Sequence, residues 1–265
     1  MNVQFFCPCW GFENLSWEDF CRKVDAAGYD GIEYAIPSET PVSLLDEIWD
    51  TVTRSGLRII AQHFDTNEAD FIKHAELYEN WLEKIKPYPV VKINSQTGKD
   101  HFTIEQNKAL ISVANNFSAQ SGNPVLHETH RGKFAYAAHS TKTYLEEMPG
   151  LRLTLDVSHW VCVAESYLDD QRDALALAIE RTDHIHARVG HTQGPQVPDP
   201  RLPAWQPALQ KHLAWWDQVV ALKKAENTLL TITTEFGPFP YLVNPAVTQW
   251  EMNIHMLKLL KSRYA

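Results

Sequence analysis

Residues 151–158 read Leu-Arg-Leu-Thr-Leu-Asp-Val-Ser, a stretch in which apolar and polar side chains alternate. Successive side chains of a β-strand point to opposite faces, so the alternation predicts a strand with leucine and valine on one face and polar residues on the other. The polar face consists of Arg152, Thr154, Asp156 and Ser158. We expect the apolar face to pack against helices and the polar face to point inward, with Asp156 near the C-terminal end of the strand.

Apolar runs of similar length recur along the whole chain and alternate with patterns typical of helices. The predicted strands lie at residues 2–7, 31–35, 58–64, 90–96, 124–130, 151–158, 183–189 and 229–236. Ser16, Ser43 and Asn67 are predicted to introduce helices, and Gly28 and Gly56 to end them. Regular alternation of strands and helices indicates a parallel α/β fold.

The length of the chain and its first predicted turn favour a closed barrel over an open sheet. At 265 residues the chain matches a (β/α)8 barrel, which needs about 250 residues. A doubly wound sheet favours a glycine-rich phosphate loop after its first strand, and Cys-Pro-Cys-Trp-Gly at 7–11 is not one. We therefore predict an α/β fold, a (β/α)8 TIM barrel, in one domain over residues 1–265. A last helix within 245–261 should close the ring.

Composition and charge exclude several classes of protein. The net charge of −9, without a Lys/Arg-rich stripe, disfavours a nucleic-acid partner. Without an apolar run of 18 residues no membrane span is expected. The four cysteines match neither a zinc pair nor a disulfide framework, and the N-terminus lacks the pattern of a signal peptide. These features predict a cytoplasmic protein with reduced thiols.

One long stretch, Gly190–Pro207, has five prolines and fits neither a helix nor a strand. Loops that follow barrel strands surround the active site, so we favour a lid over the alternative of an arm in a subunit interface.

Polar residues recur near the C-terminal ends of the last four predicted strands, where barrels place their chemistry. They are Glu128, Asp156, His186 and Glu235. Three carboxylates in one pocket repel one another unless a cation neutralises them, so the pattern predicts one bound divalent metal ion. Oxygen ligands with one imidazole favour Mn²⁺, with Mg²⁺ or Zn²⁺ as alternatives.

The segments that contain these residues resemble the xylose isomerase-like TIM-barrel superfamily. They are His127–Gly132, Leu155–Trp160, His184–His191 and Thr234–Pro238, and the resemblance covers the whole chain. Together with the loop Gly194–Arg201, they are most similar to the sugar phosphate isomerase/epimerase group, which is related to ketose 3-epimerases and AP endonuclease family 2. The resemblance implies that the four residues bind the metal and that the enzyme is an isomerase or epimerase acting on a sugar or sugar phosphate. It also implies that Glu128 and Glu235 are the acid/base pair, acting through an enediolate. Relatives often pair, so a homodimer is an option.

Four further residues are candidates for binding the substrate. His159 resembles a substrate-oxygen contact of the superfamily, and Arg188 offers a fixed positive charge, although it could instead hold a ligand carboxylate. His63, at the end of the third strand, could line the pocket or be a buried structural histidine. Trp10 could form an apolar wall for a sugar ring, although packing is the ordinary role of a tryptophan.

Other functions stay open. A dehydratase or lyase acting on a polyol would need the same metal and base, and a non-catalytic sugar-binding barrel would keep the pocket. An AP endonuclease is less favoured, because Asn94 and the Asp-Pro-Arg at 199–201 stand where the resemblance would require further zinc ligands. The unusual His130-Arg131-Gly132 after Glu128 also distinguishes this chain from the epimerases.

Overall fold

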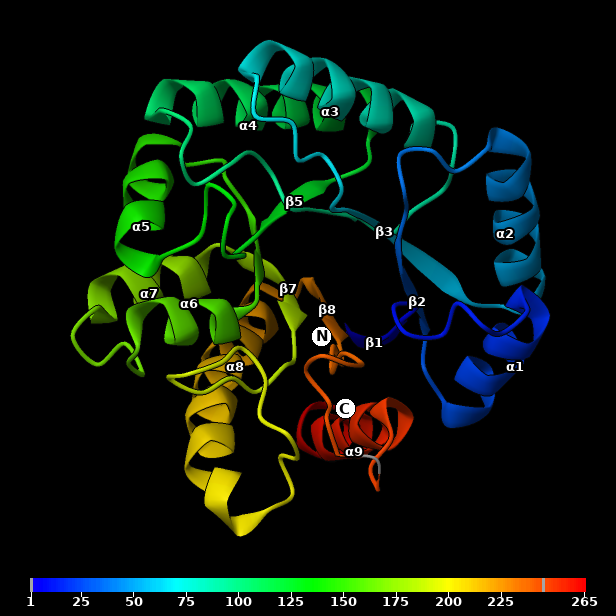
Figure 1. Cartoon of the computed structure of the whole chain (residues 1–265), viewed down its shortest axis with the longest axis vertical. Helices are drawn as coiled ribbons and strands as arrows, with labels where there is room; N and C mark the ends of the chain where they lie inside the picture. Colours follow the sequence, from blue (N-terminus) through cyan, green and yellow to red (C-terminus); the bar gives the residue numbers. More distant parts are fainter. Residues whose placement is uncertain (1, 245) are drawn as a thin grey trace.

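A computed structural model describes residues 2–244 and 246–265 of the protein, and within them eight parallel strands close into a barrel (Figure 1). Each strand pairs with its sequence neighbours, and the first pairs with the last. The strands are β1 (Asn2–Pro8), β2 (Gly31–Ala35), β3 (Arg58–His63), β4 (Ile93–Ser95), β5 (Val125–Glu128), β6 (Leu153–Leu155), β7 (Thr182–His186) and β8 (Leu229–Thr233). The predicted (β/α)8 barrel is thereby confirmed.

Helices surround the barrel and cover the outer face of its strands (Figure 1). They are α1 (Trp17–Ala27), α2 (Val42–Arg54), α3 (Phe71–Ile85), α4 (Ile104–Ser121), α5 (Ala138–Glu147), α6 (Val157–Ala164), α7 (Arg172–Glu180), α8 (Gln206–Glu226) and α9 (Gln249–Tyr264), with a 3-10 turn η1 (Pro203–Trp205). Helix α9 contacts β1 and completes the ring, as predicted. Pro245, where that predicted segment begins, lies outside the described residues. No described helix is both long enough and apolar enough to cross a bilayer.

The predicted helix boundaries are partly correct. The side chain of Ser16 accepts a hydrogen bond from the Asp19 backbone at the start of α1, and Gly28 ends that helix in the left-handed conformation. The other two predicted starts are wrong. Helix α2 follows Pro41, so Ser43 lies inside its first turn, and α3 is capped by Asp70 rather than Asn67. Several polar residues precede each helix, and spacing alone does not reveal which side chain reaches the free backbone N–H groups.

The stretch 151–158 is shorter as a strand than its alternation predicts. Strand β6 ends at Leu155, and Asp156 begins α6 by accepting a hydrogen bond from the Ser158 backbone at 3.0 Å. The alternation also predicts that Arg152 points into the barrel, and this is wrong. Arg152 lies before β6 and pairs with Asp183, with 2.6 Å between Arg152 Nε and Asp183 Oδ2. The alternation continues past the strand because a helix N-cap and a strand end both favour a short polar side chain.

The core has two parts, and they differ in polarity. Between barrel and helices the side chains are apolar, and examples are Leu153, Leu155, Ile185 and Ile232. Inside the barrel several buried side chains are polar, and they include Glu33, Thr154, His184 and Thr231. A polar interior needs internal hydrogen-bond partners, and the arrangement of these partners positions the site described next.

Candidate functional site

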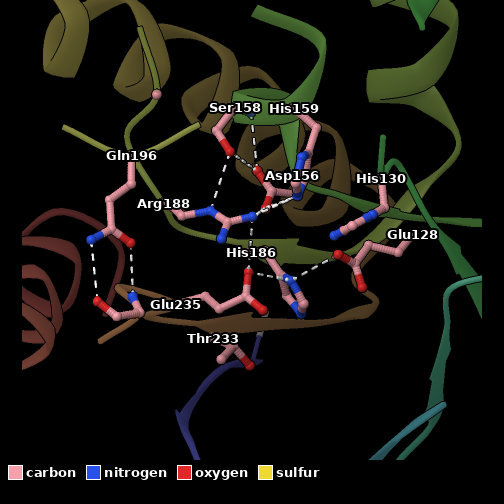
Figure 2. Close-up of polar contacts among 12 residues, drawn as sticks. Glu128, His130, Asp156, Ser158, His159, His186, Arg188, Gln196, Thr233 and Glu235 are labelled. Carbon is pink, nitrogen blue, oxygen red and sulfur yellow. Dashed lines mark hydrogen bonds and ion pairs between the residues drawn. The ribbon is translucent and has the colours of Figure 1, made fainter. Parts of the chain in front are cut away.

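Four side chains from neighbouring strands meet at the C-terminal end of the barrel (Figure 2). Glu128 ends β5, Asp156 follows β6, His186 ends β7, and Glu235 lies just beyond β8. Each is buried, and each offers one ligand atom within 4.8 Å of those of the others. The structure therefore brings together all four residues that the sequence singled out as metal ligands.

His186 and Glu235 face each other in a close contact that lacks the geometry of a hydrogen bond. His186 Nδ1 lies 2.8 Å from Glu235 Oε2 and 3.8 Å from Glu128 Oε1. In spite of this proximity, neither His186 Nδ1 nor Glu235 Oε2 makes a hydrogen bond. A buried polar atom without a hydrogen bond costs free energy, and the attraction between the two groups of this ion pair offsets only part of that cost. A divalent cation would accept electron pairs from both atoms, so this donor set fits a metal ion.

The cluster attracts positive charge. Burial lowers the pKa of His186, but Glu235 and Glu33 outweigh it and raise that pKa well above its usual value. Burial raises the pKa of Asp156 to about 6, and the nearby Arg188 opposes the rise. Asp156 Oδ1 accepts hydrogen bonds from the Ser158 backbone and hydroxyl, and Oδ2 accepts one from Arg188 Nη2. Asp156 is thus held in one orientation with lone pairs still free for a cation.

Glu33 on β2 is a buried member of the site that the sequence reasoning missed. Its Oε1 lies 2.9 Å from His186 Nε2 and 2.9 Å from Asn94 Nδ2. Its Oε2 lies 3.1 Å from His184 Nε2 and also accepts a hydrogen bond from Thr233. Burial would raise the pKa of Glu33, but the two histidines hold it well below its usual value. A charged Glu33 therefore accepts from His186 Nε2 and leaves Nδ1 facing the other carboxylates.

A sequence signal for Glu33 did exist. In Gly31-Ile32-Glu33-Tyr34-Ala35 the acidic residue alternates with the buried Ile32, so it must point into the barrel. The partner on the opposite strand β7 could not be predicted, because strand register across a barrel follows from closure rather than from local pattern.

Three of the four predicted substrate contacts lie at or directly behind the site. Arg188 and Trp10 line the cavity above the cluster. His159 is completely buried behind Arg188, with Nε2 2.7 Å from Arg188 Nη2, and its ring lies 3.9 Å from that of His130. Burial holds the pKa of His159 well below its usual value, so the neutral ring accepts a hydrogen bond from Arg188.

His63 lies apart from the cavity. It is completely buried and packs against Tyr78 and Trp81, with ring centroids 4.7 Å and 5.0 Å away. Its Nε2 lies 2.7 Å from Thr66 Oγ1, and its Nδ1 lies 3.3 Å from Ser95 Oγ. Both nitrogens are used within the core, so this geometry matches the alternative of a structural histidine.

A cavity of about 630 Å³ opens over the cluster, and its two sides differ in chemistry. The polar wall consists of Gln62, Gln96, Glu128, His130, Arg188 and Glu235. The aromatic wall consists of Trp10, Phe12, Trp17, Phe20, Tyr34, Phe64 and Tyr241. Gln62 and Gln96 each place Nε2 3.3 Å from Glu128 Oε2, so they orient this carboxylate toward the cavity.

The proline-rich stretch 190–207 contacts the segment that follows β8. Gln196 accepts a hydrogen bond from the Gly237 backbone N–H at 2.8 Å and donates one to its carbonyl at 3.3 Å (Figure 2). Gly237 in turn lies against Trp10, since a Cβ added there would be 2.2 Å from Trp10 Cη2. Val197 in the middle of the stretch is fully buried. This part of the predicted lid thus supports the backbone beside Glu235 and the ring of Trp10.

His212 on α8 links this stretch to solution pH. Its Nε2 accepts a hydrogen bond from the Gly190 backbone at 3.1 Å, and burial lowers its pKa to about 4. In the unfolded chain the histidine pKa is about 6.5, so the unfolded state binds a proton at a higher pH than the folded state does. The contribution of His212 to stability is therefore complete above pH 6.5 and is lost as the pH falls through 4.

Between pH 7 and pH 4.5, we expect the unfolding free energy of the wild type to fall by about 2–3 kcal/mol more than that of His212→Gln. Urea titrations at both pH values would measure this, with the exposed His139→Gln as the control, and equal losses in wild type and His212→Gln would contradict it.

Fold and site together define a parallel (β/α)8 barrel with a buried carboxylate–imidazole cluster that could hold a metal ion. No protein-family model matches the sequence, and no curated protein matches it significantly. Solved structures with the same fold include 3-keto-D-glucoside 4-epimerase from E. coli, at 14% identity and a TM-score of 0.65, covering 98% of this chain and 100% of that one.

Two further structures show the same relationship. The probable 3-DHS dehydratase of petrobactin synthesis from Bacillus anthracis has 17% identity and a TM-score of 0.61, covering 96% of this chain and 99% of that one. D-psicose 3-epimerase has 12% identity and a TM-score of 0.61, covering 98% and 99%. These three structures confirm, for the fold, the resemblance inferred from the sequence.

Proposed function

We propose that this protein is a metal-dependent sugar isomerase or epimerase that moves a proton next to a carbonyl. The observation that carries the proposal is the meeting of Glu128, Asp156, His186 and Glu235, with His186 Nδ1 and Glu235 Oε2 facing each other 2.8 Å apart without a hydrogen bond. Oxygen-rich ligation favours Mn²⁺, with Mg²⁺ or Zn²⁺ as alternatives. The three structures of the same fold are named for reactions of a 3-keto-D-glucoside, of 3-DHS and of D-psicose, which agrees with a small-molecule sugar substrate.

The positions of the two glutamates fit an acid/base pair. Both line the cavity, and they come from β5 and β8, so they approach a bound molecule from different sides. A divalent ion, when bound, would polarise the substrate carbonyl and stabilise the enediolate charge by several kcal/mol. One glutamate then removes the α-proton, and the other returns a proton to the opposite face.

Arg188 is suited to orient the substrate and the cluster together. Its guanidinium lines the cavity, contacts Asp156, and lies 3.7 Å from Glu235 through Nη2 and Oε2. Although burial opposes it, Asp156 and Glu235 raise the pKa of Arg188, so the side chain keeps its charge. It can therefore donate to a substrate oxygen, and His159 behind it accepts one of its N–H groups and fixes its position.

A panel of keto-sugars and their phosphates in D2O tests the proposal. Purified protein with Mn²⁺ should exchange the α-proton of at least one member, detected by NMR, and chelation of the metal should stop the exchange. Product lacking one water by mass would instead identify a dehydratase or lyase with the same base. Binding without exchange or turnover would identify a non-catalytic barrel. Cleavage of abasic-site DNA, without exchange, would support the endonuclease.

Glu33→Gln tests how His186 is oriented. The amide keeps one acceptor oxygen and replaces the other with an NH2 donor, which would face the donors that surround Glu33. The substitution also removes the negative charge of the side chain. Partners that orient metal ligands affect metal affinity by about 10–100-fold, so we expect Mn²⁺ affinity to fall in that range by calorimetry. Glu79→Gln, at an exposed position of α3, is the matched control. Unchanged affinity in a folded Glu33→Gln protein would remove Glu33 from this role.

A further inference from the structure

Four rings of the aromatic wall, namely Phe12, Trp17, Phe20 and Tyr34, come from the sector β1 to β2. Phe12 lies in the loop after β1, Trp17 and Phe20 lie on α1, and Tyr34 lies near the end of β2. Every proposed metal ligand comes instead from the sector β5 to β8. One cavity therefore joins a polar reaction site to an apolar site beside it.

The rings of the aromatic wall are packed into a fixed arrangement. The ring centroids of Trp17 and Tyr34 are 5.0 Å apart and those of Phe12 and Phe20 are 5.5 Å apart. Phe20 is buried, whereas Phe12, Trp17 and Tyr34 remain partly exposed. Rings that are already held in place lose little conformational entropy when a ligand covers them, and covering them removes apolar surface from water.

Few polar groups accompany these rings. Their neighbours in the cavity lining include Cys9, Leu15, Ala35 and Pro37. Glu13 is the charged side chain among the described lining residues of this part, and its oxygens already accept from the Gly11 backbone at 2.9 and 3.0 Å. The hydroxyl groups of a second sugar would find few partners here, and an unpaired polar group is costly to bury. The chemistry favours an aromatic group.

The size of the cavity agrees with an occupant larger than one sugar. A volume of about 630 Å³ lies within the range of about 300–1,000 Å³ typical of pockets for drug-sized ligands. A monosaccharide beside the proposed metal ligands of β5 to β8 would leave Phe12 and Trp17, which come from the sector after β1, free for a further group.

We propose that the substrate is a sugar that carries an aromatic aglycone, with the sugar at the polar wall and the aglycone on Phe12, Trp17 and Tyr34. This inference rests on the proposed function for the identity of the sugar end. It deepens that function by assigning the substrate to the class of aryl keto-glycosides, in which a ring carbon other than the anomeric one carries the carbonyl, rather than to free sugars.

Binding of unreactive glycosides tests this inference without depending on catalysis. Calorimetry on the Mn²⁺-loaded protein would compare phenyl with methyl β-D-glycosides of glucose, galactose and mannose, and with cellobiose. We expect the phenyl form of at least one sugar to bind about 10-fold or more tightly than its methyl form, and more tightly than cellobiose. Equal affinity within every pair, tighter binding of cellobiose, or no binding of any probe would overturn the proposal.

Variants locate the preference within the cavity. Trp17→Ala and, separately, Tyr34→Leu should reduce the ratio of phenyl to methyl affinity toward one, with little change for the methyl glycoside. Phe239→Ala removes a ring that is 77% exposed and does not line this cavity, so it should leave the ratio unchanged. A ratio that survives in both folded wall variants would also overturn the proposal. Failure of proton exchange with retained phenyl preference would count against the proposed reaction and not against the aglycone site.

Discussion

Glu235→Gln is expected to reduce exchange of the α-proton that Glu235 removes, which is the proton of one epimer, by about 10³-fold, within the 10²–10⁴-fold range typical of general acid–base catalysis. The substitution preserves the size of the side chain and removes its basic oxygen. The location of Glu235 at the cavity, with Oε2 2.8 Å from His186 Nδ1 and without a hydrogen bond, makes this carboxylate available to both the metal and the substrate. NMR in D2O with saturating Mn²⁺ measures the rate.

Two comparisons separate the base role of Glu235 from a role in metal binding. If Glu235 only binds the metal, excess Mn²⁺ should restore exchange in Glu235→Gln, and such restoration would contradict the base role. Glu128→Gln is the paired variant, because it should block inversion of the carbon while the remaining base still exchanges the proton of one epimer. Glu79→Gln, at the surface of α3, should exchange at the wild-type rate.

His186→Ala is expected to weaken Mn²⁺ binding by at least about 100-fold. The substitution removes the only imidazole of the proposed ligand set and leaves buried carboxylates facing one another, as Glu33 and Glu235 both lie within 3 Å of its ring nitrogens. Titration followed by the electron paramagnetic resonance signal of free Mn²⁺ gives the affinity and the stoichiometry. Exposed His139→Ala is the matched control.

Retention of one tightly bound Mn²⁺ in a folded His186→Ala protein would place the ion elsewhere. Glu128, His130 and His159 also bring ligand atoms within 4.8 Å of one another, so this group is the natural second location. His159→Ala in the same titration would then weaken binding more than His186→Ala does. The two variants together decide between the group that contains His159 and the groups that contain His186.

Much of the site could be predicted because the C-terminal ends of all the strands lie at the same end of a (β/α)8 barrel. The place of a residue within its own strand therefore indicates whether it lies near the site. Glu128 and His186 end their strands, and Asp156 and Glu235 lie one and two residues after theirs, so alternation and strand order were enough to predict that they meet at one end of the fold. The same reasoning failed for Arg152, which lies before β6 and pairs with Asp183, and for the length of β6, because Ser158 contacts the site from the first turn of α6. Strand ends depend on hydrogen bonds to neighbouring segments, and these partners are distant in the sequence.

Other features depended on residues far apart in the chain. The pair Glu33–His186 spans the barrel from β2 to β7, and the contact between Gln196 and Gly237 fixes the backbone beside Glu235. The aromatic wall likewise combines residues from several loops with Tyr241 near the other end of the sequence. In a chain with many aromatic residues, composition does not indicate which rings face a cavity.

The sequence by itself determined that strands and helices alternate around a closed barrel and that acidic and imidazole side chains gather at its C-terminal end, because periods of 2.0 and 3.6 residues and chain order are local properties. Only the tertiary structure decided which nitrogen of His186 faces the carboxylates, which histidine is merely packed, and where the apolar side of the cavity lies. Closure of the ring brings β2 opposite β7 and the first loop beside the last, and contacts of this kind depend on the three-dimensional path of the chain rather than on any one segment.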